Sequence, residues 1–226
     1  ADWTREEKGQ LSLLCPSVLV CCAWVNGEAE IVNAKAGSSV TLNSGKITKA
    51  NQTLWTYGAE KPSFLIAKVS SSQGSFWAQP QFKERLNLDR ETGDLTISKL
   101  SLNDTGVYER QRIGTYISSK QFKLEVYSPL SPPSVNVEKS YSGECQVECS
   151  VKNSRNLTLT WFKGNDWLQR MSSSDSAGLS LALNLNQRET HKYFCEARNP
   201  LENMTARFHP NEICLKNGGR KMCNFM

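Results

Sequence analysis

Four cysteines in the second half of the chain, arranged around a tryptophan and a tyrosine, constrain the fold more than any other feature. Cys149 lies in the alternating segment ECQVECSV, Trp161 follows in LTLTWFKGN, and Cys195 closes the segment KYFC. Tyr193 and Cys195 form a Tyr-x-Cys motif. In this order, the two cysteines bridge two packed sheets and the indole packs against the bridge. The pattern predicts a β-sandwich with a Cys149–Cys195 disulfide.

A second cysteine pair, Cys145 and Cys214, brackets the first pair in the sequence. A disulfide between the start of the second strand and the last strand is one interpretation, and a zinc site suggested by CQVEC is the other. Structural zinc needs four converging ligands at tighter spacing, and Cys149 and Cys195 already belong to the sandwich pattern. We therefore favour two nested disulfides, which would stabilise a small core. The segment 135–215 is predicted to be a constant-like immunoglobulin domain.

The first half of the chain has the same pattern without the cysteines. Ser44 in GSSVTLNSG and Arg110 in VYERQ occupy the two expected cysteine positions, and Trp55 lies between them. The D-x-G-x-Y run that ends at Tyr108 is typical of the corner before strand F, where the tyrosine hydroxyl bonds back to the backbone. The longer interval from Ser44 to Arg110 fits additional strands. Residues 28–127 are thus predicted to form a variable-like domain without an inter-sheet disulfide.

Arg110 conflicts with its predicted position. Strict alternation from Tyr108 points it inward, and burying a guanidinium without a partner is costly. We consider three explanations: the strand register slips, the charged group of Arg110 extends past its aliphatic stem to solvent, or it pairs with a carboxylate. We favour a slip or a solvent-reaching side chain.

The remaining segments complete an all-β chain of two tandem immunoglobulin-like sandwiches. Residues 128–134 (SPLSPPS) are a proline-rich linker of limited flexibility, and residues 216–226 are a C-terminal tail. Residues 1–27 contain the apolar run LSLLCPSVLVCCAWV, which is similar to a signal peptide, although a buried strand is the alternative. The chain does not begin with Met, so we expect a fragment or an unprocessed translation that includes the leader.

Export agrees with the other residue patterns. Disulfides form in oxidising compartments, and four Asn-x-Ser/Thr sequons predict glycosylation at Asn51, Asn103, Asn156 and Asn203. The segment after Cys214, LKNGGRKMCNFM, has neither an apolar span nor a lipid-anchor signal. We expect a soluble product as written, or a C-terminus lost by truncation or splicing, with Cys223 left over.

Composition and motifs argue against several functions. The net charge of +5 is spread along 226 residues, so a nucleic-acid partner is not expected. The chain has 2 histidines, neither near a plausible nucleophile, and it lacks a phosphate loop and a zinc-protease motif. We expect no enzyme, no cofactor and no metal site.

The combination of domains resembles the signalling lymphocytic activation molecule (SLAM) family of leukocyte receptors, and most closely its lipid-anchored ligand member. The resemblance covers residues 28–215 and rests on LSLNDTGVY, on Cys145 with Cys149, and on CEARNP with the distant Cys214. It implies homophilic or heterophilic recognition of an immunoglobulin-superfamily receptor on another immune cell. A secreted decoy and an unrelated two-domain immunoglobulin adhesion molecule are the alternatives.

The same resemblance implies that the first domain binds its partner through the sheet face made by strands G, F, C and C′. Mixed charges on such a face would set specificity and association rate more than affinity, although outward charges on a sheet are often only solvated. Carried onto this sequence, the expected partner-binding residues are Thr56, Glu60, Lys68, Glu109, Gln111, Arg112, Gln121, Lys123 and Glu125.

Overall fold

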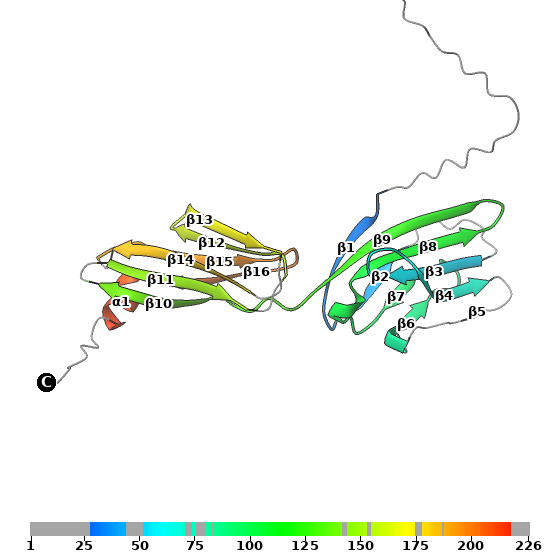
Figure 1. Ribbon diagram of the computed structural model, residues 1–226, viewed down its shortest axis with the longest axis horizontal. Coiled ribbons are helices and arrows are strands. Elements are labelled where there is room, and N and C mark those ends of the chain that lie inside the picture. The colour runs from blue at the N-terminus through cyan, green and yellow to red at the C-terminus, as the bar shows by residue number, and fades with distance from the viewer. Residues whose placement is uncertain are drawn as a thin grey trace, which may run out of the picture.

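The computed structural model describes residues 28–43, 52–70, 74–75, 80–82, 84–141, 144–152, 155–174, 178–186 and 188–217. Within these residues the chain forms two β-sandwiches arranged end to end (Figure 1). The architecture predicted from the sequence is therefore confirmed. The predicted leader, Ser44, Asn51 and Cys223 lie outside the described residues.

The first sandwich has a large and a small sheet. The large sheet has the order β1–β9–β8–β3–β4–β5, with β1 parallel to β9, and the small sheet has the order β2–β7–β6. Strands β4 and β5 extend the large sheet as the C′ and C″ strands extend a variable-type domain. The bounds are β1 Glu30–Lys35, β2 Val40–Leu42, β3 Gln52–Gly58, β4 Phe64–Ser70, β5 Gly74–Ser75, β6 Leu86–Leu88, β7 Leu95–Ile97, β8 Gly106–Ile113 and β9 Ile117–Tyr127, with short 3-10 helices η1 at Pro80–Phe82 and η2 at Leu102–Asp104.

The core of the first sandwich forms around Trp55 and Tyr108, both of which are fully buried. The Trp55 indole nitrogen donates to the Gly93 carbonyl at 2.9 Å, so burial leaves it satisfied. The Tyr108 hydroxyl donates to the Asp104 carbonyl at 2.8 Å, which is the corner bond predicted from the sequence. The Asp104 carboxylate in turn accepts two bonds from Arg85, each of 2.7 Å. These contacts fix the turn from which β8 begins.

Arg110 is buried in this core, and both explanations favoured from the sequence are wrong. The register of β8 against β3 is continuous, with Arg110 opposite Trp55, so no slip occurs. The residue is only 5% exposed, so its side chain does not reach solvent. Burial and the nearby Arg112 lower the pKa of Arg110, while the carboxylate of Asp94 opposes that shift. Of the three explanations, the continuous register and the burial leave only an interaction with a carboxylate.

The second sandwich also has two sheets, of order β10–β11–β14 and β13–β12–β15–β16. Strand β13 lies at the edge of the four-stranded sheet and pairs with β12, with a register shift between Trp161 and Phe162. The bounds are β10 Ser134–Tyr141, β11 Glu144–Val151, β12 Leu157–Lys163, β13 Asp166–Ser173, β14 Leu179–Asn186, β15 Tyr193–Arg198 and β16 Asn203–Phe208, followed by the helix α1 at Pro210–Asn217.

Both disulfides of the second domain are formed. Cys149 and Cys195 join the two sheets with an S–S distance of 2.02 Å, and Trp161 is buried beside them with its indole nitrogen on the Leu181 carbonyl at 2.9 Å. Cys145 is bonded to Cys214, so the zinc interpretation of CQVEC is wrong.

From the sequence we expected the outer disulfide to join the last strand, but it does not. Cys214 lies in α1, because the chain leaves the sheet after Phe208 and Pro210 begins a helix. The disulfide therefore fastens this helix to β11. Within the described part of the chain, no helix has the length and apolar character needed to cross a membrane.

Contacts between the two sandwiches converge on Glu202, in the turn between β15 and β16. Its carboxylate accepts the backbone N–H of Leu130 at 2.9 Å and pairs with Lys35 of the first domain at 2.6 Å. Beside them, the side-chain amide of Asn156 donates to the hydroxyl of Tyr127 at 3.1 Å. Residues 128–133 connect β9 to β10 between these bonds. The linker is thus stiffened by its prolines and bonded to the second sandwich, while Glu202 and Asn156 bond the two sandwiches to each other.

Candidate partner-binding face

The outer face of the large sheet in the first domain displays alternate side chains of β3, β8 and β9. Glu109 on β8 lies opposite Thr56 on β3 and opposite Gln121 on β9. Cross-strand partners point to the same side of a sheet, so these side chains form one row. We call the outward side chains of β9, β8, β3 and β4 the GFCC′ face.

The predicted residues occupy this face as follows. A second row joins Gln111 to Leu54, and Leu54 to Lys68 on β4. Lys123 lies opposite Val107 in a third row. Glu60 is exposed in the turn after β3 rather than on a strand. The predicted residues that the strands bring to the face are Thr56, Lys68, Glu109, Gln111, Gln121, Lys123 and Glu125.

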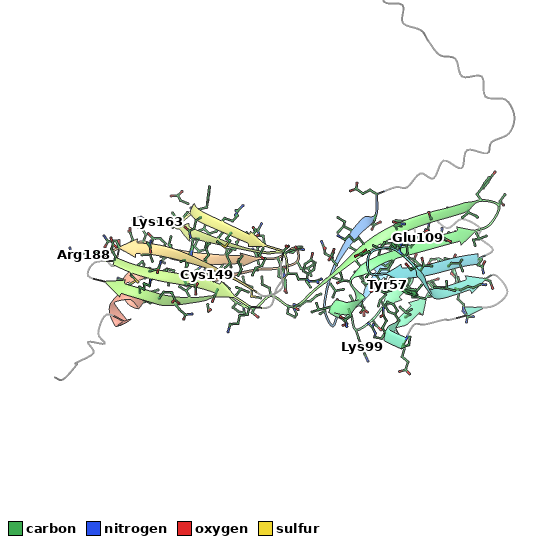
Figure 2. The ribbon with its side chains drawn as sticks, viewed as in Figure 1. Tyr57, Lys99, Glu109, Cys149, Lys163 and Arg188 are labelled. Carbon is green, nitrogen blue, oxygen red and sulfur yellow. A yellow bond between two sulfur atoms is a disulfide. The ribbon has the colours of Figure 1, made fainter. Side chains whose placement is uncertain are left out.

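Glu109 lies at the centre of these rows, and its carboxylate is held by two side-chain amides. Gln111 donates to one oxygen at 2.9 Å and Gln121 donates to the other at 3.1 Å. Both donors are neutral, so they orient the carboxylate without cancelling its charge. A fixed anion on a half-buried strand position is suited to receive a cationic side chain from another protein. Figure 2 labels Glu109 on the first sandwich.

Lys123, in the row next to Glu109, carries a charge that is paired within its own strand. The Lys123 ammonium pairs with the Glu125 carboxylate of the same strand at 3.0 Å, and the lysine side chain is 54% exposed. Exposed ion pairs of this kind contribute little to folding. They are therefore available to exchange partners when a complementary surface arrives, and the face offers both signs of charge.

Arg112 does not belong to the face, which corrects our expectation. Arg112 is not a turn residue, because β8 continues to Ile113. Arg112 therefore alternates inward with Arg110 and is 5% exposed. One of its guanidinium nitrogens donates to the Thr92 carbonyl at 2.6 Å. The charge of Arg112 therefore lies inside the domain and not on the GFCC′ face.

Sequence reasoning missed the apolar part of the face. Leu54 and Ile113 are half-buried on the outward side of β3 and β8. Ile117 is 73% exposed and Tyr116 is 85% exposed in and beside the turn between β8 and β9. Alternation from Tyr108 could have identified Ile113, but the turn residues follow no period. Exposed aromatic and aliphatic side chains beside charged ones are typical of protein interfaces.

Three of the four predicted glycosylation sites lie among the described residues, and all three are exposed. Asn103 is exposed in η2, and Asn203 is exposed at the start of β16. The exposed Asn156 precedes β12 and contacts Tyr127. Glycosylation of these asparagines remains a prediction.

Comparisons with known proteins find similarity to surface proteins with immunoglobulin domains. The model of the immunoglobulin V-set domain matches residues 27–127. The human T-lymphocyte surface antigen Ly-9 is 25% identical over 205 residues, which is 84% of this chain and 30% of Ly-9. Human CD48 antigen is 27% identical over 160 residues, covering 68% of this chain and 63% of CD48. Human lymphocyte function-associated antigen 3 is 24% identical over 203 residues, or 88% of this chain and 75% of that protein.

Solved structures show the same fold. The CD2-binding domain of CD58 superposes with a TM-score of 0.65 at 20% identity, covering 80% of this chain and 96% of that one. Bovine butyrophilin superposes with a TM-score of 0.64 at 16% identity, covering 81% and 96%. The relatives are extracellular surface proteins and none is an enzyme, which confirms the predicted class and location. The first domain matches the immunoglobulin V-set family, and the chain is similar along both domains to the SLAM family member Ly-9 and to lymphocyte function-associated antigen 3.

Proposed function

We propose that this chain is a recognition ectodomain of immune cells, which binds an immunoglobulin-superfamily receptor on another cell through the GFCC′ face. The observation that carries the proposal is Glu109, an oriented carboxylate at the centre of an exposed sheet. Its surroundings combine a movable ion pair at Lys123 with apolar side chains such as Leu54 and Ile113. The partner's face would be complementary, with a cationic side chain opposite Glu109.

Similar proteins support this choice of partner class. One structure of the same fold is described as the CD2-binding domain of CD58. Ly-9 is named as a T-lymphocyte surface antigen, and CD48 is named as an antigen. This chain spans less than a third of Ly-9 and less than two thirds of CD48, at 30% and 63% of their lengths.

Charge reversal on the face tests the proposal. Fluorescent tetramers of the whole chain would be applied to leukocytes, with Glu109→Arg and Lys123→Glu compared against the unchanged chain. Asn87→Lys is the matched control, because Asn87 is exposed on β6 in the opposite sheet. We expect each reversal to lower the association rate by about tenfold or more, since like charges would meet across the interface.

Two results would contradict the proposal. Staining that is unchanged by both reversals would exclude the GFCC′ face, and a loss caused equally by Asn87→Lys would point to a nonspecific charge effect. Thermal unfolding of each variant must match the unchanged chain, which is expected because both side chains lie on the surface.

A further inference from the structure

The second domain carries an aromatic row on the outer face of its β13–β12–β15–β16 sheet. Phe162 on β12 lies opposite Trp167 on β13 and opposite Phe194 on β15. Phe194 in turn lies opposite Arg207 on β16. Residues paired across strands share a face, so the order across the sheet is Trp167, Phe162, Phe194, Arg207. Lys163, labelled in Figure 2, is the next residue along β12 and marks this end of the domain.

Trp167 and Arg207 in this row are exposed, and Phe162 and Phe194 between them are half-buried. Trp167 is 66% exposed, and the rings of Phe162 and Phe194 are stacked with centroids 4.6 Å apart and planes inclined by 8°. Large aromatic side chains that remain in solvent on a flat sheet mark sites of protein association. Trp and Arg are the residue types that most often anchor such interfaces. The GFCC′ face of the first domain does not include this row.

We propose that the row is a docking surface for a second copy of this chain, side by side and pointing the same way. A two-fold axis parallel to the strands, between β12 and β15, would place each Trp167 against Arg207 of the other copy. It would also place Phe162 against Phe194. Both contacts occur twice, as a two-fold symmetric interface requires. A guanidinium over an indole is an attractive cation–π contact.

The neighbouring row has the same self-complementarity. Its order across the sheet is Arg170, Thr160, Glu196, Thr205. The same axis brings Arg170 one strand away from Glu196 of the other copy, within reach of a long side chain. An axis perpendicular to the strands would instead place Trp167 on Trp167 and Arg207 on Arg207, which opposes like charges. Charge complementarity therefore selects the parallel arrangement over the antiparallel one.

The predicted glycosylation site nearest this row on β16 is Asn203, at the other end of the strand. Asn203 begins β16 in the row nearest the first domain, opposite Arg198. It lies about 13 Å along the strand from Arg207, at about 3.3 Å per residue. Asn156 is at the same end, in contact with Tyr127. Two parallel copies would carry their first domains at the same end of the dimer, which raises avidity for an opposing cell.

Sedimentation equilibrium of the whole chain tests the proposal, with the chain itself as the probe. We expect reversible, concentration-dependent dimers, and Trp167→Lys should raise the dissociation constant about tenfold or more because lysine would meet Arg207 of the other copy. Trp167→Glu should dimerise about tenfold more tightly than Trp167→Lys, since a carboxylate meeting Arg207 is attractive. Each variant is also measured in a Glu109→Arg background, which separates this contact from any association through the first domain.

The pair of variants at Trp167 also decides the orientation. In the antiparallel arrangement Glu would meet Glu and Lys would meet Lys, so equal weakening of the two variants would overturn the parallel dimer. A chain that stays monomeric at all concentrations would overturn the second copy as occupant. Salt-dependent retention on heparin that is lost in Arg207→Glu, with no dimer, would assign the surface to an anionic polysaccharide instead. Unchanged thermal unfolding is the folding control, because Trp167 is largely in solvent.

Discussion

Replacing Asp104 by asparagine should strongly destabilise the first domain. The Asp104 side chain is 1% exposed and pairs with Arg85, which is 17% exposed. Its carboxylate accepts two bonds of 2.7 Å from that guanidinium and a third bond of 2.7 Å from the backbone N–H of Ser101. The asparagine keeps the shape and one acceptor oxygen but removes the charge.

The magnitude follows from the burial of the pair. Removing one member of a buried ion pair costs about 3–5 kcal/mol, because the other charge is left in a poor environment. Arg85 keeps partial solvent access and also donates to the Ser98 and Lys99 carbonyls, so the lower end applies. We expect the free energy of unfolding of the first domain to fall by about 3 kcal/mol. For a domain of this size, that lowers Tm by roughly 10–20 °C.

Calorimetry resolves this effect because the second domain provides an internal reference. Only the transition of the first domain should move, while the disulfide-bonded second domain should melt unchanged. A double-mutant cycle with Arg85→Met would isolate the coupling free energy between the two side chains. A change below about 1 kcal/mol, or a cycle without coupling, would refute the assignment of Asp104 and Arg85 as the bond that fixes the corner before β8.

Two further predictions concern the second domain and the joint. Replacing Cys145 and Cys214 by serine opens a loop of 69 residues that the Cys149–Cys195 disulfide already shortens. The chain-entropy model then predicts a loss of about 3 kcal/mol in the stability of the second domain. Urea unfolding measures this loss, and an unchanged midpoint would contradict it. The Leu130 N–H and the Lys35 ammonium lower the pKa of Glu202 from its ordinary 4.5. Its carboxylate therefore stabilises the joint fully above that value and loses this contribution as pH falls through the lowered pKa. Small-angle scattering should show that the relative orientation of the two domains becomes more variable as pH falls from 7 to 3. Glu202→Gln should already show this variability at pH 7. Identical profiles for the unchanged chain and the Glu202→Gln chain would exclude the role of Glu202.

Much of the fold could be predicted from the sequence because its strongest signals are local. The alternation in ECQVECSV, the Tyr-x-Cys motif at Cys195 and the run that ends at Tyr108 each specify a strand and a face. Extra length before Tyr108 indicated the strands β4 and β5. Alternation from Tyr108 also places Glu109 outward. It would have placed Arg112 inward had the strand expected from the sequence been extended by two residues, to Ile113.

What could not be predicted depends on contacts between distant segments. Burial lowers the pKa of Arg110 and the Asp94 carboxylate opposes that shift, and no local sequence pattern reports this interaction between distant residues. Cys214 lies in a helix because the chain turns away from the sheet after β16. The outward positions of Phe162 and Phe194 follow from their buried neighbours, but their stacking depends on the register between β12 and β15. Register is fixed by the assembled core rather than by either strand.

The most direct test of the central claim is to map which lysines are covered when the chain is bound to leukocytes. Brief acylation of bound and free chain, followed by mass spectrometry, reports each amine without any mutation. Lys123 is 54% exposed on the GFCC′ face, and we expect binding to protect it from acylation. Lys99, exposed beside the opposite sheet, and Lys192, exposed on the second domain, should react equally in both states. Protection of Lys192 with Lys123 unchanged would contradict the account and move the binding surface to the second domain.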